Sequence, residues 1–253
     1  MNKDIAKLSI DKRKRLAGNK RIAKSTLDRL SQDKSYLVRR LVVTNPKTSA
    51  ETLAVLSGDK NIAIRYYVAK NPNTSAETLA KLSKDADDSV RWEVAENSNT
   101  SAETLAKLSR DKDADVRCNV ASNPNTASIV LEKLSGDKDE GVRIFVAENP
   151  NTSAETLTKL SADNDEVRWN VANNKSSSLT AVLSIFNRDT YLDSKIMSMT
   201  KKRISFIFGI NKHPKYTIPT RKYRDKFSKL NIWTGDMTDN LRSIMTSVSL
   251  LNK

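Results

Sequence analysis

The stretch NPNTSAETLAKLSKDADDSVRWEVAE, residues 71–96, contains the whole pattern that decides the fold. Its first residue, Asn71, belongs to a column of asparagines that recurs every twenty-six positions. A fixed period of about 20 to 50 residues is typical of a solenoid built from stacked repeats. The column comprises Asn19, Asn45, Asn71, Asn97, Asn123 and Asn149, and Asn173 follows after a slightly shorter interval as a seventh member.

Two short helices are predicted within each repeat. Thr74, followed three residues later by Glu77, has the spacing of a capping box, in which the threonine hydroxyl accepts a backbone N–H of the first helical turn. Leu79 and Leu82 mark the buried side of this first helix. Both leucines belong to columns that never change residue type: Leu27, Leu53, Leu79, Leu105, Leu131 and Leu157, and Leu30, Leu56, Leu82, Leu108, Leu134 and Leu160.

A second helix is predicted around Val90 and Val94, after a turn at Ser83–Asp85. The Asn-Pro step that opens the next repeat in most copies is expected to end it, since Asn tolerates the left-handed backbone conformation and Pro cannot continue a helix. Neither helix is long enough to bury its apolar side alone. Stacking of neighbouring repeats must therefore supply the core.

The string Val-Arg-x-x-Val-Ala-x-Asn-Pro-x-Thr, followed by Leu-x-x-Leu-Ser-x-Asp, resembles the leucine-rich repeat variant family. It reads VRWEVAENSNTSAETLAKLSRD at residues 90–111 and VRIFVAENPNTSAETLTKLSAD at residues 142–163, and it covers roughly residues 19–174. The resemblance implies an all-α, right-handed α-solenoid of about six 26-residue two-helix repeats, related in shape to HEAT repeats. A founding member carries an iron–sulfur cluster on N-terminal cysteines, but this chain has only Cys118, so no cofactor is expected.

Charge and composition predict three regions: a basic N-terminal cap at residues 1–18, the solenoid at 19–186, and a basic C-terminal region at 187–253 that is helical with an extended segment. Lys and Arg outnumber Asp and Glu by 13 to 4 over residues 1–44 and by 15 to 5 over 175–253, whereas residues 45–174 are mildly acidic at 16 to 21. A single cysteine and no long apolar segment predict a cytoplasmic protein that does not enter a membrane.

An arginine recurs at one position of the second helix, and an aspartate precedes it by six residues in every copy but the last. A residue that appears in every repeat is more readily explained by the scaffold than by a ligand. We therefore interpret the column as an Asp–Arg ladder that connects turns, helices and neighbouring repeats, in preference to a phosphate-binding ladder. The arginines are Arg39, Arg65, Arg91, Arg117, Arg143 and Arg168, and the aspartates are Asp33, Asp59, Asp85, Asp111, Asp137 and Asp163.

The two positions after each arginine vary from repeat to repeat. At about 100° per residue they point away from the predicted core side of the second helix. Large side chains there indicate a surface for a protein partner, although lateral packing between adjacent second helices explains them equally well. The resulting candidate site, called the variable stripe below, consists of Arg40, Tyr66, Tyr67, Trp92, Ile144, Phe145 and Trp169.

The basic ends provide an alternative, in which the chain binds nucleic acid. Clusters of Lys and Arg can follow a phosphate backbone, and the aromatic residues between those of the C-terminal region could stack on bases. A solvated basic surface explains the same clusters. The candidate residues are Arg13, Lys14 and Arg15 near the N-terminus, and Lys201, Lys202, Arg203, Arg221, Lys222, Arg224 and Lys226 near the C-terminus.

No enzyme is predicted. The lone histidine, His213, has no neighbouring carboxylate pair, and glycine-rich phosphate loops and metal-spaced clusters are absent from the sequence. A DNA glycosylase of the HEAT-like kind is the least favoured alternative, because it would need a buried carboxylate beside exposed aromatics in a concave cleft. The sequence therefore favours a non-catalytic scaffold for a protein partner, with no metal and no cofactor.

Overall fold

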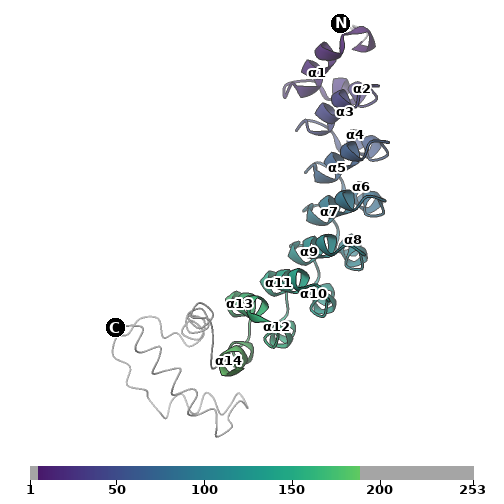
Figure 1. Ribbon diagram of the computed structural model, residues 1–253. Coiled ribbons are helices and arrows are strands. Elements are labelled where there is room, and N and C mark those ends of the chain that lie inside the picture. Colours follow the sequence, from purple (N-terminus) through teal and green to yellow (C-terminus); the bar gives the residue numbers. More distant parts are fainter. Residues whose placement is uncertain (1–4, 189–253) are drawn as a thin grey trace, which may run out of the picture. The chain divides into compact units, whose positions relative to one another are not determined.

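The computed structural model describes residues 5–188, without the side chains of Leu179, Leu183 and residues 186–188. Within these residues the chain forms a short 3₁₀ helix, Ile5–Lys7, and fourteen α-helices (Figure 1). It divides into two units, Met1–Phe145 and Val146–Lys253. The C-terminal candidates for nucleic-acid binding, Lys201 to Lys226, lie outside the described residues, and so does the greater part of the predicted region 187–253.

First and second helices alternate along the first unit and form two rows (Figure 1). Each second helix packs on the next one, α1 on α3, α3 on α5, α5 on α7 and α7 on α9. The first helices are α2 (Lys24–Leu30), α4 (Ala50–Leu56), α6 (Ala76–Leu82), α8 (Ala102–Leu108) and α10 (Ser128–Leu134). The second helices are α1 (Ile10–Gly18), α3 (Tyr36–Val43), α5 (Ile62–Lys70), α7 (Asp88–Glu96), α9 (Ala114–Ser122) and α11 (Glu140–Glu148), which runs into the second unit.

The second unit continues the same alternation over its described part. Helix α12 (Ala154–Leu160) is a first helix, α13 (Asp165–Asn173) is a second helix, and α14 (Leu179–Arg188) packs on both. The described residues thus confirm the all-α solenoid of two-helix repeats.

The core consists of the columns that the sequence singled out. Leu79 is fully buried and Leu82 is 2% exposed, and the equivalent leucines of the other repeats are 0–3% exposed. On the second helices Val90 and Val94 are fully buried, as is Ala95. Because each first helix has only seven residues, most of this burial depends on contacts with other helices of the stack.

The N-caps differ from the prediction. The residue that caps α6 is Ser75, whose hydroxyl accepts from the backbone N–H of Thr78. The hydroxyl of Thr74 is fully buried and donates instead to the carbonyl of Val68, on the preceding second helix. Thr126 makes the same bond to Val120, although Ala127 stands at the cap position of α10 and leaves it without a side-chain cap. Threonine is therefore constant because it connects successive helices.

The asparagine column also has a different physical cause from the predicted one. Asn97 ends α7 in an extended conformation, with φ −65° and ψ 127°, so a left-handed backbone is not needed. Its amide nitrogen donates to the carbonyls of Ala69 and Asn71 in the preceding repeat, and its amide oxygen accepts from the N–H of Asn99. In the second unit the residue that makes these bonds is Asn174, whereas Asn173, the predicted seventh member, is the last residue of α13.

The arginine and aspartate columns form the predicted ladder. The guanidinium of Arg91 donates from Nε and Nη2 to both carboxylate oxygens of Asp111, twenty residues later, at 2.6 and 3.0 Å. Its Nη1 donates to the carbonyls of Asp85 and Ala86, in the turn that precedes its own helix. Equivalent ion pairs are Arg13–Asp33, Arg39–Asp59, Arg65–Asp85 and Arg117–Asp137. In the second unit Arg168 pairs with Asp165 and donates to the carbonyl of Asp163.

Loss of one ladder arginine should destabilise the solenoid strongly. In Arg91→Ala the carboxylate of Asp111, whose side chain is 8% exposed, loses its guanidinium partner. Removal of one member of a buried ion pair costs about 3 kcal/mol. Urea denaturation followed by circular dichroism should show this loss, whereas the exposed neighbour Arg110→Ala should cost less than about 0.5 kcal/mol. Equal effects of the two variants would contradict the role of the ladder.

The ladder also predicts acid sensitivity. Burial alone would raise the pKa of Asp111, but hydrogen bonds from Arg91 and from the backbone N–H of Asp113, together with the charge of Arg91, lower it below the ordinary 3.8. The pKa values of Asp59, Asp85 and Asp137 are lowered in the same way. A carboxylate with a lowered folded pKa stabilises the fold above its unfolded pKa, and this contribution is lost as the pH falls through the folded value.

We therefore expect the urea midpoint to be nearly constant from neutral pH to just above the ordinary aspartate pKa and to fall below it. The Asp111→Asn variant should start lower and lose less stability over the same acid range, because one titrating group has been removed. A variant with an unchanged acid profile would show that the Asp111 carboxylate does not contribute.

Candidate protein-interaction surface

The variable stripe lies on the second helices. In the first unit Arg40 is on α3, Tyr66 and Tyr67 are on α5, and Trp92 is on α7. Ile144 and Phe145 are on α11, and Trp169 is on α13 in the second unit. Arg40 is exposed and the Phe145 side chain is 36% exposed, whereas the other five residues are half-buried. The stripe therefore reaches the surface without being fully exposed.

Lateral contacts between neighbouring second helices involve Arg40, Tyr67 and the backbone of Trp92. The guanidinium of Arg40 on α3 lies 5.8 Å from the ring centroid of Tyr67 on α5, a cation–π distance. Tyr67 meets Tyr66 edge to face, with ring centroids 5.3 Å apart. On α9 the amide of Asn119 donates to the carbonyl of Trp92 on α7. Lateral packing therefore occurs at these positions, and Tyr66, Tyr67 and Trp92 remain half-buried rather than closed.

A buried carboxylate lies among the stripe residues of the second helices. Glu93 lies two residues after the ladder arginine Arg91, at what we call the second stripe position, and it is only 2% exposed. The prediction that this position points away from the core is therefore wrong for this residue. The ammonium of Lys70 on α5 donates to its Oε1 at 2.9 Å and lies 5.6 Å from the ring centroid of Tyr66. A hydrogen bond to Glu93 is the main cause that raises the pKa of Tyr66, and it also raises the pKa of Lys70. In the second unit Asn170 is likewise buried at this position.

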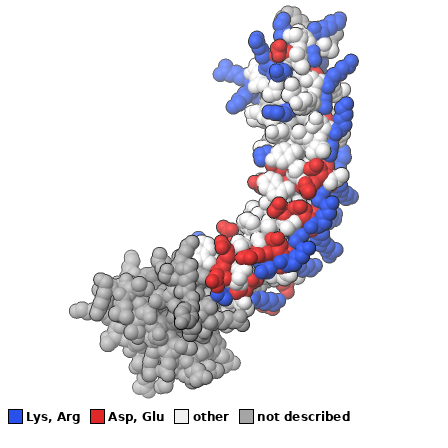
Figure 2. Space-filling view, viewed as in Figure 1, with Lys and Arg blue, Asp and Glu red and all other residues white. Residues whose placement is uncertain are grey.

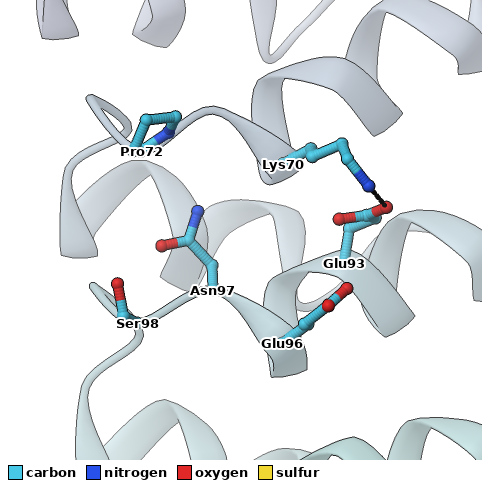
Figure 3. A pocket seen from close by; sticks show the side chains of 6 residues that line it. All are labelled: Lys70, Pro72, Glu93, Glu96, Asn97 and Ser98. Carbon is cyan, nitrogen blue, oxygen red and sulfur yellow. Dashed lines mark hydrogen bonds and ion pairs between the residues drawn. The ribbon is translucent and has the colours of Figure 1, made fainter.

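A cavity of about 300 Å³ opens beside this pair, between the ends of α5 and α7 (Figure 3). Lys70 and Glu93 point toward one another on one side, with Glu96 on the next turn of α7. Pro72, Asn97 and Ser98 complete the lining from the segments that follow the two helices. The lining residues include no aromatic side chain.

The predicted site did not include Lys70 or Glu93. Their pairing has a sequence signal, because Glu93 is the one charged residue in a column otherwise filled by Leu41, Tyr67, Asn119, Phe145 and Asn170. Lys70 lies about one helical turn after the position on α5 that is equivalent to Glu93 on α7. The two side chains therefore meet on neighbouring helices.

The N-terminal candidates for nucleic-acid binding have different surroundings. Arg13 forms a ladder ion pair with Asp33 at 2.6 Å, and its side chain is 17% exposed. Lys14 lies 3.5 Å from Asp11, and Arg15 is exposed. Figure 2 shows Lys and Arg side chains at both edges of the N-terminal end, with few acidic ones between them. Charged groups are therefore available here, but Arg13 belongs to the scaffold.

Within residues 5–188, no group of His, Cys, Asp and Glu side chains has the arrangement of a metal site. In the same part of the chain, each helix is too short or too polar to cross a bilayer.

The comparisons with known proteins agree with this architecture. The model of the family described as leucine rich repeat variant matches residues 140–165. A solved structure described as a leucine-rich repeat variant with a novel repetitive structural motif is 25% identical, with a TM-score of 0.55, and the match covers 72% of this chain and 71% of that one. The class defined by the fold is thus an α-solenoid of two-helix repeats, and the predicted resemblance to the leucine-rich repeat variant family is confirmed.

An engineered protein of known structure is 15% identical, with a TM-score of 0.37, over 78% of this chain and 73% of its own. None of the curated proteins matches the chain.

Cys118 lies on α9, directly after the ladder arginine Arg117, and it should be unreactive in the folded protein. Burial is the main cause that raises the pKa of its thiol to about 11, and Asp139 adds to the effect. The thiolate is the reactive form, so its fraction at pH 8 should be about 100-fold lower than that of an ordinary cysteine. Reaction with an aromatic disulfide reagent at pH 8 should be slower by about this factor in buffer than in 6 M guanidinium. Equal rates would show that Cys118 is accessible and ionised.

Proposed function

We propose that the chain is a non-catalytic scaffold that binds a protein partner through the variable stripe. The observation that carries the proposal is a row of large aromatic and apolar side chains that stay partly accessible beside fully buried core positions of the same helices. On α7, for example, Val90 and Val94 are fully buried, whereas Trp92 is half-buried. Aromatic residues and arginine are the side chains most enriched in the energetically dominant part of protein interfaces.

The lateral contacts support this proposal because they restrain the stripe before a partner arrives. Tyr66 contacts the ammonium of Lys70, which is itself paired with Glu93, and Tyr67 contacts the guanidinium of Arg40. Side chains already held in one rotamer lose less conformational entropy on binding than free ones. The stripe between α3 and α7 therefore has both the accessible area and the order of an anchoring surface.

A catalytic function has less support. Glu93 is a buried carboxylate beside aromatic residues, which is one feature required of a HEAT-like glycosylase. The adjacent cavity, however, has no aromatic side chain to stack on a base, and Lys70 neutralises the carboxylate directly. A general acid or base would instead need a proton-transfer path to a bound substrate. The cytoplasmic location stays a prediction.

The experiment is capture of partners from the native host by the immobilised chain, followed by affinity measurements with the purified partner. The triple variant Tyr67→Ala, Trp92→Ala and Phe145→Ala should weaken binding at least 30-fold, since one interface anchor is worth about 2 kcal/mol. Tyr66 is left unchanged because it holds Glu93.

The matched control truncates exposed apolar residues of first helices, Val55→Ala and Ile129→Ala, whose side chains are 61% and 57% exposed. It should bind like the unaltered chain, and circular dichroism should show equal helicity for all three proteins. Unchanged affinity of the triple variant would exclude the stripe as the binding surface.

A further inference from the structure

The first repeats carry a charge imbalance that the proposed function does not use. Over residues 5–44 the chain has twelve Lys and Arg but only three Asp and Glu. All three acidic residues have partners: Asp33 binds Arg13, Asp11 lies 3.5 Å from Lys14, and Asp28 accepts a hydrogen bond from Thr52. Beyond these residues, the charge of Lys24 contributes to lowering the pKa of Glu51 on α4, without an ion pair, so little negative charge offsets the other cations.

Seven exposed cations remain after the ladder arginines, Lys7, Lys14 and the stripe residue Arg40 are set aside. Among residues 5–188 they take part in no ion pair. Some basic residues of later repeats, by contrast, pair with nearby carboxylates, such as Lys107 with Glu103 at 2.8 Å. We call the seven the N-terminal cationic cluster: Lys12 and Arg15 on α1, Lys20 and Arg21 between α1 and α2, Lys24 and Arg29 on α2, and Lys34 before α3.

Unpaired like charges on neighbouring short helices repel one another and destabilise the compact state. The ladder and the buried leucines of these repeats do not require them, because Arg13, Leu27 and Leu30 make the structural contacts without them. A bound polyanion would remove the repulsion and release its own counterions.

We infer that the N-terminal cationic cluster binds the phosphate backbone of a nucleic acid. Four of its seven members are lysines, which are depleted in protein–protein interfaces but are ordinary partners of phosphates. Figure 2 shows the basic side chains at both edges of this end, whereas a flat lipid surface would contact one side at a time. A nucleic-acid strand can bend around such an end and contact cations on more than one side.

The inference concerns a surface apart from the variable stripe, and the two can be tested separately. Fluorescence anisotropy of labelled 20-nucleotide oligo(dT) and of a labelled 20-base-pair duplex would be measured with the full chain at 50 and 200 mM NaCl. Binding should be present at low salt, independent of sequence, and should weaken steeply at the higher salt concentration. No binding of either probe at 50 mM NaCl would overturn the inference.

The decisive variant is Lys20→Gln, Arg21→Gln and Lys24→Gln, three exposed residues of the cluster. It should bind at least about tenfold more weakly at 50 mM NaCl, and the slope of log affinity against log salt should fall by about 2, since each lost contact removes about 0.7 to 0.9. The matched control, Lys81→Gln, Lys107→Gln and Lys133→Gln, removes the same charge from first helices further along and should change affinity less than about threefold.

Three further outcomes would overturn the inference. The cluster variant could bind like the unaltered chain, as it would if only the basic C-terminal residues bound nucleic acid. The control could lose as much affinity as the cluster variant, as it would if only total charge mattered. Polyglutamate, or vesicles of equimolar phosphatidylserine and phosphatidylcholine, could bind to the cluster as tightly as the oligonucleotides. The stripe variant should bind oligonucleotides normally, so failure here leaves the protein-binding proposal untouched.

Discussion

The two-pronged hydrogen bond from ladder arginines such as Arg39, Arg65, Arg91 and Arg117 to an aspartate of the next repeat is the interaction on which the rest of the structure depends. One guanidinium connects three segments: its own helix, the turn before it, and the turn of the following repeat, as Arg91 does with Asp85 and Asp111. The receiving carboxylate also accepts a backbone N–H of its own turn. The ladder therefore defines the spacing of neighbouring repeats, which the leucine contacts, being non-directional, cannot do alone.

The period, the two helices and the buried columns could all be predicted from the sequence, because each follows from the spacing of apolar residues along one chain. The roles of Thr74 and Asn97 could not. Both residue types have a familiar local function at helix ends, and their positions in the sequence match that function. Their side chains in fact bond to carbonyls of another helix or of the preceding repeat. Conformational preference cannot reveal such a partner, since it lies 6 to 28 residues away.

The same limit applies to the candidate surface. A helical wheel identifies the side of one helix that faces its own core, but in a stack each second helix also has a neighbour on either side. The second stripe position therefore holds the buried Glu93 in one repeat and the 36%-exposed Phe145 in another. The burial and the contacts of a side chain at this position depend on residues of the preceding repeat, such as Lys70 and Tyr66. To predict whether this position is buried, one must know which helices are neighbours as well as the periodicity of a single helix.

A constant frame is what makes this variation possible. The ladder, the asparagine amides and the leucines use fixed columns, so substitutions at the other positions of a repeat alter the surface without altering the stack. In the first repeats those positions are occupied by cations without an ion pair, and in the middle repeats by aromatic residues beside an ion pair in which only the carboxylate of Glu93 is buried. Because interactions in a solenoid are confined to adjacent repeats, the two surfaces can differ in chemistry along one regular scaffold. The protein partner and the nucleic acid proposed above would therefore occupy separate surfaces without a change in the fold.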